Sequence, residues 1–188
     1  MKLEVRAAAG LSLKGKKIIG RPIVYNSPSD NLGGFVEVIS PGAFGDSVNG
    51  DIRALVEHDY KMLIGRTQSN TMRIKEDREG ILVEIDPPNT RTADELLESI
   101  ERRDITGMSF GFTVNDQGAE WNFDNDPALR TVTSAVLHEI TITSMPAYRA
   151  TNVQVAMRHL ESYKNSSALN SLGYELDLAK YKTEVLGC

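Results

Sequence analysis

The side chains best suited to chemistry in this sequence of 188 residues are one serine and three histidines. Ser109 lies in the stretch GMSFGF (107–112), with a glycine two positions away on each side. The histidines are His58, His138 and His159. A serine hydroxyl becomes a nucleophile near neutral pH when a base takes its proton, and histidine is the usual base. These residue types leave two interpretations of Ser109: a nucleophile activated by a histidine, or only a polar residue on the outer face of a half-buried strand.

Other kinds of site find little support in the sequence. The single cysteine, Cys188, is the last residue, and the histidines lack HxxxH spacing, so we expect no disulfide framework, no metal site and no cofactor. No P-loop and no helix-opening GxGxxG motif occurs, and GMSFG lacks the GxSxG spacing of α/β-hydrolases. The net charge of -5 disfavours nucleic-acid binding. No apolar run of about 18 residues and no secretory signal is present, so we expect no membrane contact and a reducing compartment.

The elements that must position these residues are mostly strands, because apolar residues alternate with polar ones over the first two thirds of the chain. A proline-interrupted strand at 16–26, a short helix within 40–48 and a hairpin of 70–77 with 80–87 are expected. Helical spacing over 90–104 and 151–163 predicts two helices, the first capped by Thr92 with Glu95. The remaining predicted strands cover 34–39, 52–59, 105–114 and 128–148.

The alternation also predicts which side chains share a face. In the strand 105–114, Met108, Phe110 and Phe112 share one face and Ser109 shares the other with Gly111. In the strand 128–148, Glu139 is expected beside Leu137 and Thr141, and His138 on the opposite face. Only one of these two neighbours can then reach His58. The residues alone thus indicate a β-rich soluble domain with one Ser/His pair.

Three motifs in order extend this interpretation. The chain contains VEHDYKMLIGR (56–66), then GMSFGF, then LHEITITSMPAY (137–148), preceded by GRPIVYN and ISPGAF. Together they resemble the prohead maturation proteases of HK97-like tailed phages over about residues 15 to 155. The resemblance implies a herpesvirus-assemblin-like α+β fold. We expect it to be β-rich, a mainly antiparallel, closed or nearly closed β-barrel surrounded by a few helices.

The resemblance also implies roles for individual residues. His58 matches the general base, Ser109 the nucleophile and Glu139 the acid that orients the histidine. In the related herpesvirus proteases the third member is another histidine, so His138 stays open as an alternative, and Asp59 is a third candidate. The polar neighbour Thr141 and the family motif favour Glu139. No cofactor is implied.

The implied substrate is the scaffolding segment of the major capsid protein, followed by the protease itself, inside a prohead assembled in the host cytoplasm. We expect a protease domain over residues 1–160 and a mobile tail over 161–188. The segment KNSSALNSLG (164–173) is a candidate for self-cleavage. A catalytically inactive capsid-assembly module and a different hydrolase, such as an esterase, are the alternatives. Neither cleavage specificity nor oligomeric state follows from the sequence.

Overall fold

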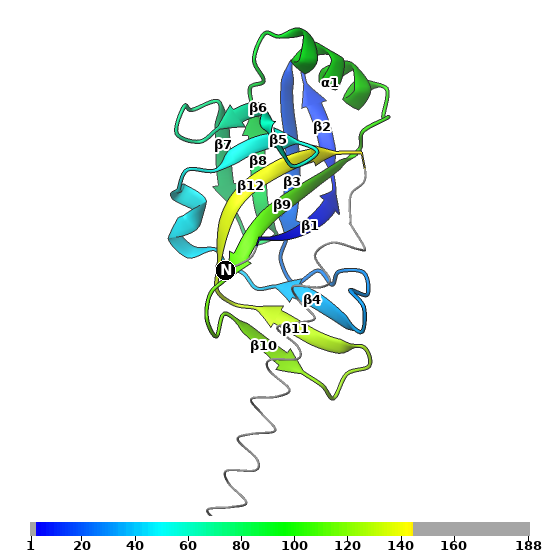
Figure 1. The fold of residues 1–188 in the computed structure, drawn as a ribbon, viewed down its shortest axis with the longest axis vertical. Helices are drawn as coiled ribbons and strands as arrows, with labels where there is room; N and C mark the ends of the chain where they lie inside the picture. The colour runs from blue at the N-terminus through cyan, green and yellow to red at the C-terminus, as the bar shows by residue number, and fades with distance from the viewer. Residues whose placement is uncertain (1–2, 145–188) are drawn as a thin grey trace, which may run out of the picture. The chain divides into compact units, whose positions relative to one another are not determined.

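The computed structural model describes residues 3–144, which form three β-sheets, one α-helix and one short 3-10 helix (Figure 1). The first sheet has the order β1-β9-β12-β5-β6. Its strands are β1 (Glu4–Ala9), β9 (Gly107–Val114), β12 (Ala135–Thr143), β5 (Arg53–Val56) and β6 (Asp59–Arg66). The ladders β12–β5 and β11–β4 are parallel, and the other ladders of the described residues are antiparallel.

Two smaller sheets complete the described part of the chain. The second sheet has the order β2-β3-β8-β7, with strands β2 (Leu11–Lys14), β3 (Lys17–Val24), β8 (Gly80–Ile85) and β7 (Met72–Glu76). The third has the order β10-β11-β4, with strands β10 (Ala119–Asn122), β11 (Ala128–Val132) and β4 (Phe35–Ile39). The helices are η1 (Gly45–Asn49) and α1 (Arg91–Glu101).

The main core lies between the first and second sheets, which face each other in Figure 1. Ile18, Ile81 and Ile85 enter it from the second sheet, and Phe110 and Phe112 enter it from β9. Every residue of β9 is buried, as expected for a central strand with neighbours on both edges. The strand that carries Ser109 is therefore hydrogen-bonded to β1 on one edge and to β12 on the other, and its apolar face packs on the core.

The β-rich α+β class is confirmed, but the expected closed or nearly closed barrel is wrong for the described residues. A barrel needs every strand to be hydrogen-bonded along both edges. In residues 3–144 the outer strands β1 and β6 of the first sheet are paired along one edge only, as are β2 and β7 of the second. The two sheets meet through apolar side chains rather than through a continuous ladder.

Several local predictions are confirmed and others are wrong. The hairpin forms as β7 and β8, and the irregularity in the first strand appears as a register shift between Gly20 and Ile23. The helix is present, but its N-cap is Thr90 rather than Thr92: Thr90 has extended backbone angles, and its hydroxyl accepts from the Ala93 N–H. The long strand predicted over 128–148 divides into β11 and β12.

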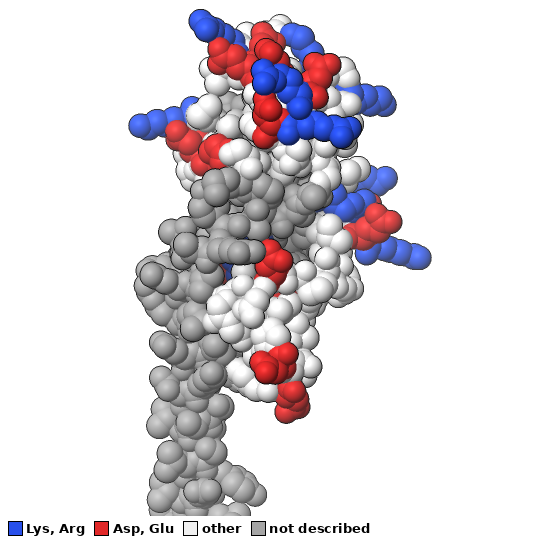
Figure 2. Space-filling model, turned by 90° about the vertical axis from the view of Figure 1, so that its right-hand side faces the viewer, with Lys and Arg blue, Asp and Glu red and all other residues white. Residues whose placement is uncertain are grey.

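Charged side chains on and next to the second sheet form solvent-exposed ion pairs. Lys17 and Arg73 both contact Glu84 and Asp86 at 2.5–3.3 Å. Figure 2 shows a similar mixture of Lys and Arg with Asp and Glu at the upper end of the view, where Figure 1 places α1. Within residues 3–144, no helix is long and apolar enough to cross a membrane.

Some predictions lie outside the described residues. These are the helix at 151–163, the tail at 161–188 with its candidate self-cleavage segment, and the positions of His159 and Cys188.

Candidate active site

Ser109 lies in the middle of β9, on the face opposite the core. Its neighbours Met108 and Phe110 point into the core, while Ser109 pairs with Thr141 of β12 and Gly111 pairs with Glu139. Residues directly opposite in an antiparallel ladder project from the same face, so these four share one surface of the sheet. The predicted alternation of β9 is confirmed, and it places the serine beside the acid of the neighbouring strand.

A β-bulge in β12 determines that Glu139, rather than His138, lies on the same face of the sheet as Ser109. Leu137 pairs with Phe112 and Glu139 with Gly111, so His138 is one extra residue in the ladder. The phase of the strand changes at this point. Glu139 therefore shares a face with Thr141, as predicted, but Leu137 points into the core with Ile140, contrary to the prediction.

His58 is presented by the tight turn between β5 and β6. Val56 pairs with Asp59 across this turn, and both Glu57 and His58 have left-handed backbone angles, with φ of 51° and 58°. His58 Nδ1 lies 2.7 Å from Glu139 Oε1. The histidine side chain is 26% exposed and the carboxylate 1%, so the pair is shielded on the side of the acid.

Glu139 is held by more than the histidine. The Thr141 hydroxyl donates to Glu139 Oε2 at 2.7 Å, which leaves Oε1 for His58. The carboxylate lies directly over Gly111, where an added Cβ would be 3.0 Å from Glu139 Cγ and 3.1 Å from Cδ. The second glycine of GMSFG therefore provides the space for the acid. Neither role was predicted, because both depend on the register between β9 and β12.

The two alternative partners of His58 make other contacts. Nε2 of His138 lies 2.9 Å from the Thr113 hydroxyl, and partial burial lowers the pKa of the histidine, against a smaller opposing effect of the Glu139 charge. Asp59 accepts a hydrogen bond from the Lys61 N–H at 2.8 Å and is exposed. Of the three candidates, Glu139 is the one that the described structure brings to His58.

The Ser109 hydroxyl, which is buried with its residue 2% exposed, donates to the carbonyl oxygen of Arg6 at 2.8 Å. Among the described residues this contact, rather than one to His58, engages the hydroxyl. Arg6 belongs to the edge strand β1, and its side chain leaves the strand on the opposite face, 5.5 Å from the ring centroid of Phe112.

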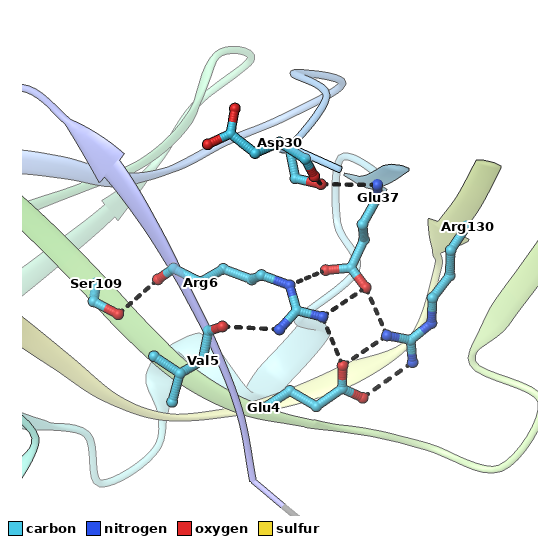
Figure 3. A network of polar contacts seen from close by, with 8 residues as sticks. Glu4, Val5, Arg6, Asp30, Glu37, Ser109 and Arg130 are labelled. Carbon is cyan, nitrogen blue, oxygen red and sulfur yellow. Dashed lines mark hydrogen bonds and ion pairs between the residues drawn. The ribbon is translucent and has the colours of Figure 1, made fainter. Parts of the chain in front are cut away.

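A buried cluster of four charges fixes β1 from that opposite face (Figure 3). Arg130, which is 0% exposed, contacts Glu4 and Glu37 at 2.6 Å, and Arg6 contacts the same two carboxylates at 2.9 and 2.7 Å. Two positive and two negative charges balance, which makes their burial tolerable. The cluster ties β1 to β4 and β11 and so holds the Arg6 carbonyl beside Ser109.

The arrangement suits the activation of a hydroxyl group. Within residues 3–144, no group of three or more His, Cys, Asp or Glu side chains could hold a metal ion. A histidine hydrogen-bonded to a buried carboxylate, on the face of a strand serine, is instead the usual set of groups for activating a hydroxyl.

Comparison with known proteins gives a family match that includes the residues of the candidate site. The sequence profile of a family described as Caudovirus prohead serine protease matches residues 1–166. No curated protein and no solved structure matches the chain.

Proposed function

The chain belongs to the Caudovirus prohead serine protease family and is a serine peptidase, and we propose that Ser109 is its nucleophile, His58 its general base and Glu139 the acid that orients His58. The observation that carries the proposal is the 2.7 Å contact between His58 Nδ1 and Glu139 Oε1, on the face of the sheet that also carries Ser109. A contact of this kind orients the imidazole and stabilises its charged form.

The proposed reaction begins with a rotation of the Ser109 side chain away from the Arg6 carbonyl. Because Glu139 occupies Nδ1, the other ring nitrogen, Nε2, acts as the base. The serine oxygen attacks the carbonyl carbon of the scissile peptide while its proton passes to Nε2. His58 then gives this proton to the leaving amine, and an acyl-enzyme on Ser109 remains. A water molecule, deprotonated by the same histidine, then attacks the acyl carbon; the ester bond to Ser109 breaks, His58 returns the proton to the serine oxygen, and the new carboxyl end of the substrate leaves.

We further propose that the substrate is the scaffolding segment of the major capsid protein, inside the prohead, and that the protease afterwards cleaves itself. Membership of the family supports a capsid protein as substrate. Confinement within a shell raises the local concentration of substrate, so a modest catalyst suffices. The proposed protease domain covers residues 1–160, and the candidate self-cleavage segment at 164–173 belongs to the proposed C-terminal tail, residues 161–188.

Co-expression with the cognate capsid protein tests this function. Wild-type protease is expected to convert the capsid protein to a shorter form on a denaturing gel, and Ser109→Ala is expected to leave it intact. Ser12→Ala is the control, because Ser12 is an exposed strand serine whose hydroxyl donates to the Ile19 carbonyl, away from Ser109 and Glu139. Cleavage by the Ser109→Ala protein would contradict the proposed nucleophile. An uncut capsid protein with the wild type, in proheads that nevertheless mature, would favour an inactive assembly module.

A further inference from the structure

The turn that carries His58 has a backbone conformation that its own sequence does not favour. Tight turns with two successive left-handed residues usually contain Asn, Asp or Gly at those positions. Here the two residues are Glu57 and His58, with φ of 51° and 58°. A residue with a Cβ atom adopts this conformation at a cost in energy, so contacts from elsewhere must hold the turn.

Glu57 supplies these contacts. Its N–H donates to the Ile142 carbonyl at 3.0 Å, its Oε2 accepts from the Thr143 hydroxyl at 2.7 Å, and its Oε1 accepts from the Ser144 N–H at 2.7 Å. One residue of the turn thus contacts three consecutive residues at the end of β12. The backbone contact continues the parallel pairing of β5 with β12 one step beyond Val56.

Strand β12 therefore contacts both residues of the turn, His58 and Glu57. Glu139, Thr141 and Thr143 project from one face of β12 at alternate positions. Glu139 contacts His58, Thr141 holds Glu139, and Thr143 contacts Glu57. Both residues of the turn, Glu57 and His58, are therefore held by side chains of the same strand.

The charge of Glu57 strengthens its hold. Partial burial by itself raises the pKa of Glu57, but the hydrogen bonds from Ser144 and Thr143, together with the nearby charge of His58, outweigh this effect and bring the pKa below its ordinary value. The side chain is accordingly a carboxylate near neutral pH, and hydrogen bonds to a carboxylate are stronger than those to a neutral acceptor.

We infer that Glu57 is a positioning residue, whose carboxylate clamps the His58 turn to the end of β12 and so keeps His58 against Glu139. The inference rests on the proposed role of His58 as the general base. It assigns no contact with substrate to Glu57.

Labelling with a biotinylated fluorophosphonate measures the effect without a known cleavage sequence. The Ser109 oxygen attacks phosphorus, fluoride leaves, and the serine proton passes to His58, so the labelling rate reports activation of the hydroxyl. We expect Glu57→Ala to lower this rate about tenfold or more, as orientation effects in catalysis commonly do. The labelling rate of Glu57→Gln is expected to lie between those of the wild type and Glu57→Ala, because the amide oxygen of glutamine can accept one of the two side-chain hydrogen bonds.

Asp59→Asn is the matched control. Asp59 flanks His58 on the other side and carries the same charge, and within residues 3–144 its carboxylate accepts a hydrogen bond from the local Lys61 N–H alone. The clamp predicts that Asp59→Asn labels within about twofold of the wild type, as is usual for exposed side chains that make few contacts. An equal loss in Asp59→Asn and Glu57→Gln would show that charge next to His58 matters rather than the clamp, and would overturn the inference.

A second readout separates this inference from the proposed function. The proton on His58 Nδ1, held by Glu139, is expected to give a downfield signal in the proton NMR spectrum of the wild type, and Glu57→Ala is expected to broaden or remove it. Glu57→Gln keeps the measurement possible should Glu57→Ala fail to fold. An unchanged signal in both Glu57 variants would overturn the clamp, even in a protein that the probe does not label. A wild type that does not label at all would instead contradict the proposed role of Ser109.

Discussion

Replacing Gly111 by alanine tests how closely the site depends on the packing of Glu139 over β9. The φ angle of Gly111 lies outside the left-handed region, so alanine fits the backbone. The new methyl group does not fit the carboxylate. It would lie 3.0 Å from Glu139 Cγ and closer still to Oε1, whereas ordinary contact begins at 3.4 Å.

The size of the effect follows from the displacement. Relief of the clash moves Oε1 by about 1 Å, which takes a 2.7 Å hydrogen bond to His58 beyond the usual limit for such bonds. A lost hydrogen bond to a charged group costs about 1.5–3 kcal/mol. At 1.36 kcal/mol per factor of ten, we expect the labelling rate of Ser109 to fall about 10- to 150-fold. Complete loss of the orienting acid sets an upper bound of about 10⁴-fold.

The assay is the rate of fluorophosphonate labelling, accompanied by the free energy of unfolding in denaturant. Gly65→Ala is the matched control. Gly65 lies in β6 of the same sheet as Gly111, but the nearest atom to its added methyl would be Ile85 Cγ2 of β8, at 2.9 Å, and Glu139 is not among its three nearest contacts. We expect Gly65→Ala to lose stability but to keep its labelling rate. In a Glu139→Ala background, Gly111→Ala is expected to add little, since the group it displaces is gone. A Gly111→Ala protein that labels at the wild-type rate would contradict the expected displacement of Glu139, and so would an undiminished effect of Gly111→Ala in the Glu139→Ala background.

Two further predictions concern stability. Burial lowers the pKa of His138 in the folded protein below its ordinary value of 6.5. As the pH falls through 6.5, His138 is therefore protonated in the unfolded chain before it is protonated in the folded protein, which favours the unfolded state. The free energy of unfolding should therefore decrease from pH 7 towards pH 5, and His138→Gln should flatten this part of the curve; equal slopes would contradict it. Arg130→Met leaves Glu4 and Glu37 buried with one cation fewer and should cost about 3–5 kcal/mol. Arg73→Met, at an exposed ion pair, should cost less than about 1 kcal/mol, and similar losses in the two variants would count against the buried cluster.

The sequence predicts those features that depend on uninterrupted local alternation. β9 is one: its apolar residues alternate without a break, so the face that carries Ser109 is correctly predicted. The hairpin of β7 and β8 is another, because a glycine-containing turn separates two alternating runs. Both features depend on residues close together in the chain.

The features that were missed depend on pairing between distant segments. The bulge at His138 arises from the register of β12 against β9, and it moves Leu137 into the core in a way that alternation alone cannot indicate. The strand β1 was not predicted, because Glu4 and Arg6 do not have the pattern of a buried strand until Glu37 and Arg130 neutralise them. The left-handed turn at His58 lacks the Asn-Gly signal by which such turns are found in sequence.

The role of Ser109 as the nucleophile can be tested by finding which residue the fluorophosphonate modifies. After reaction of the full chain with the fluorophosphonate, we expect peptide mass spectrometry to find the phosphonyl group on Ser109 alone. His58→Ala and Glu139→Ala are expected to lower the amount of modified peptide, in that order of severity. Modification of another serine, or modification of Ser109 at an undiminished rate without His58, would contradict the account.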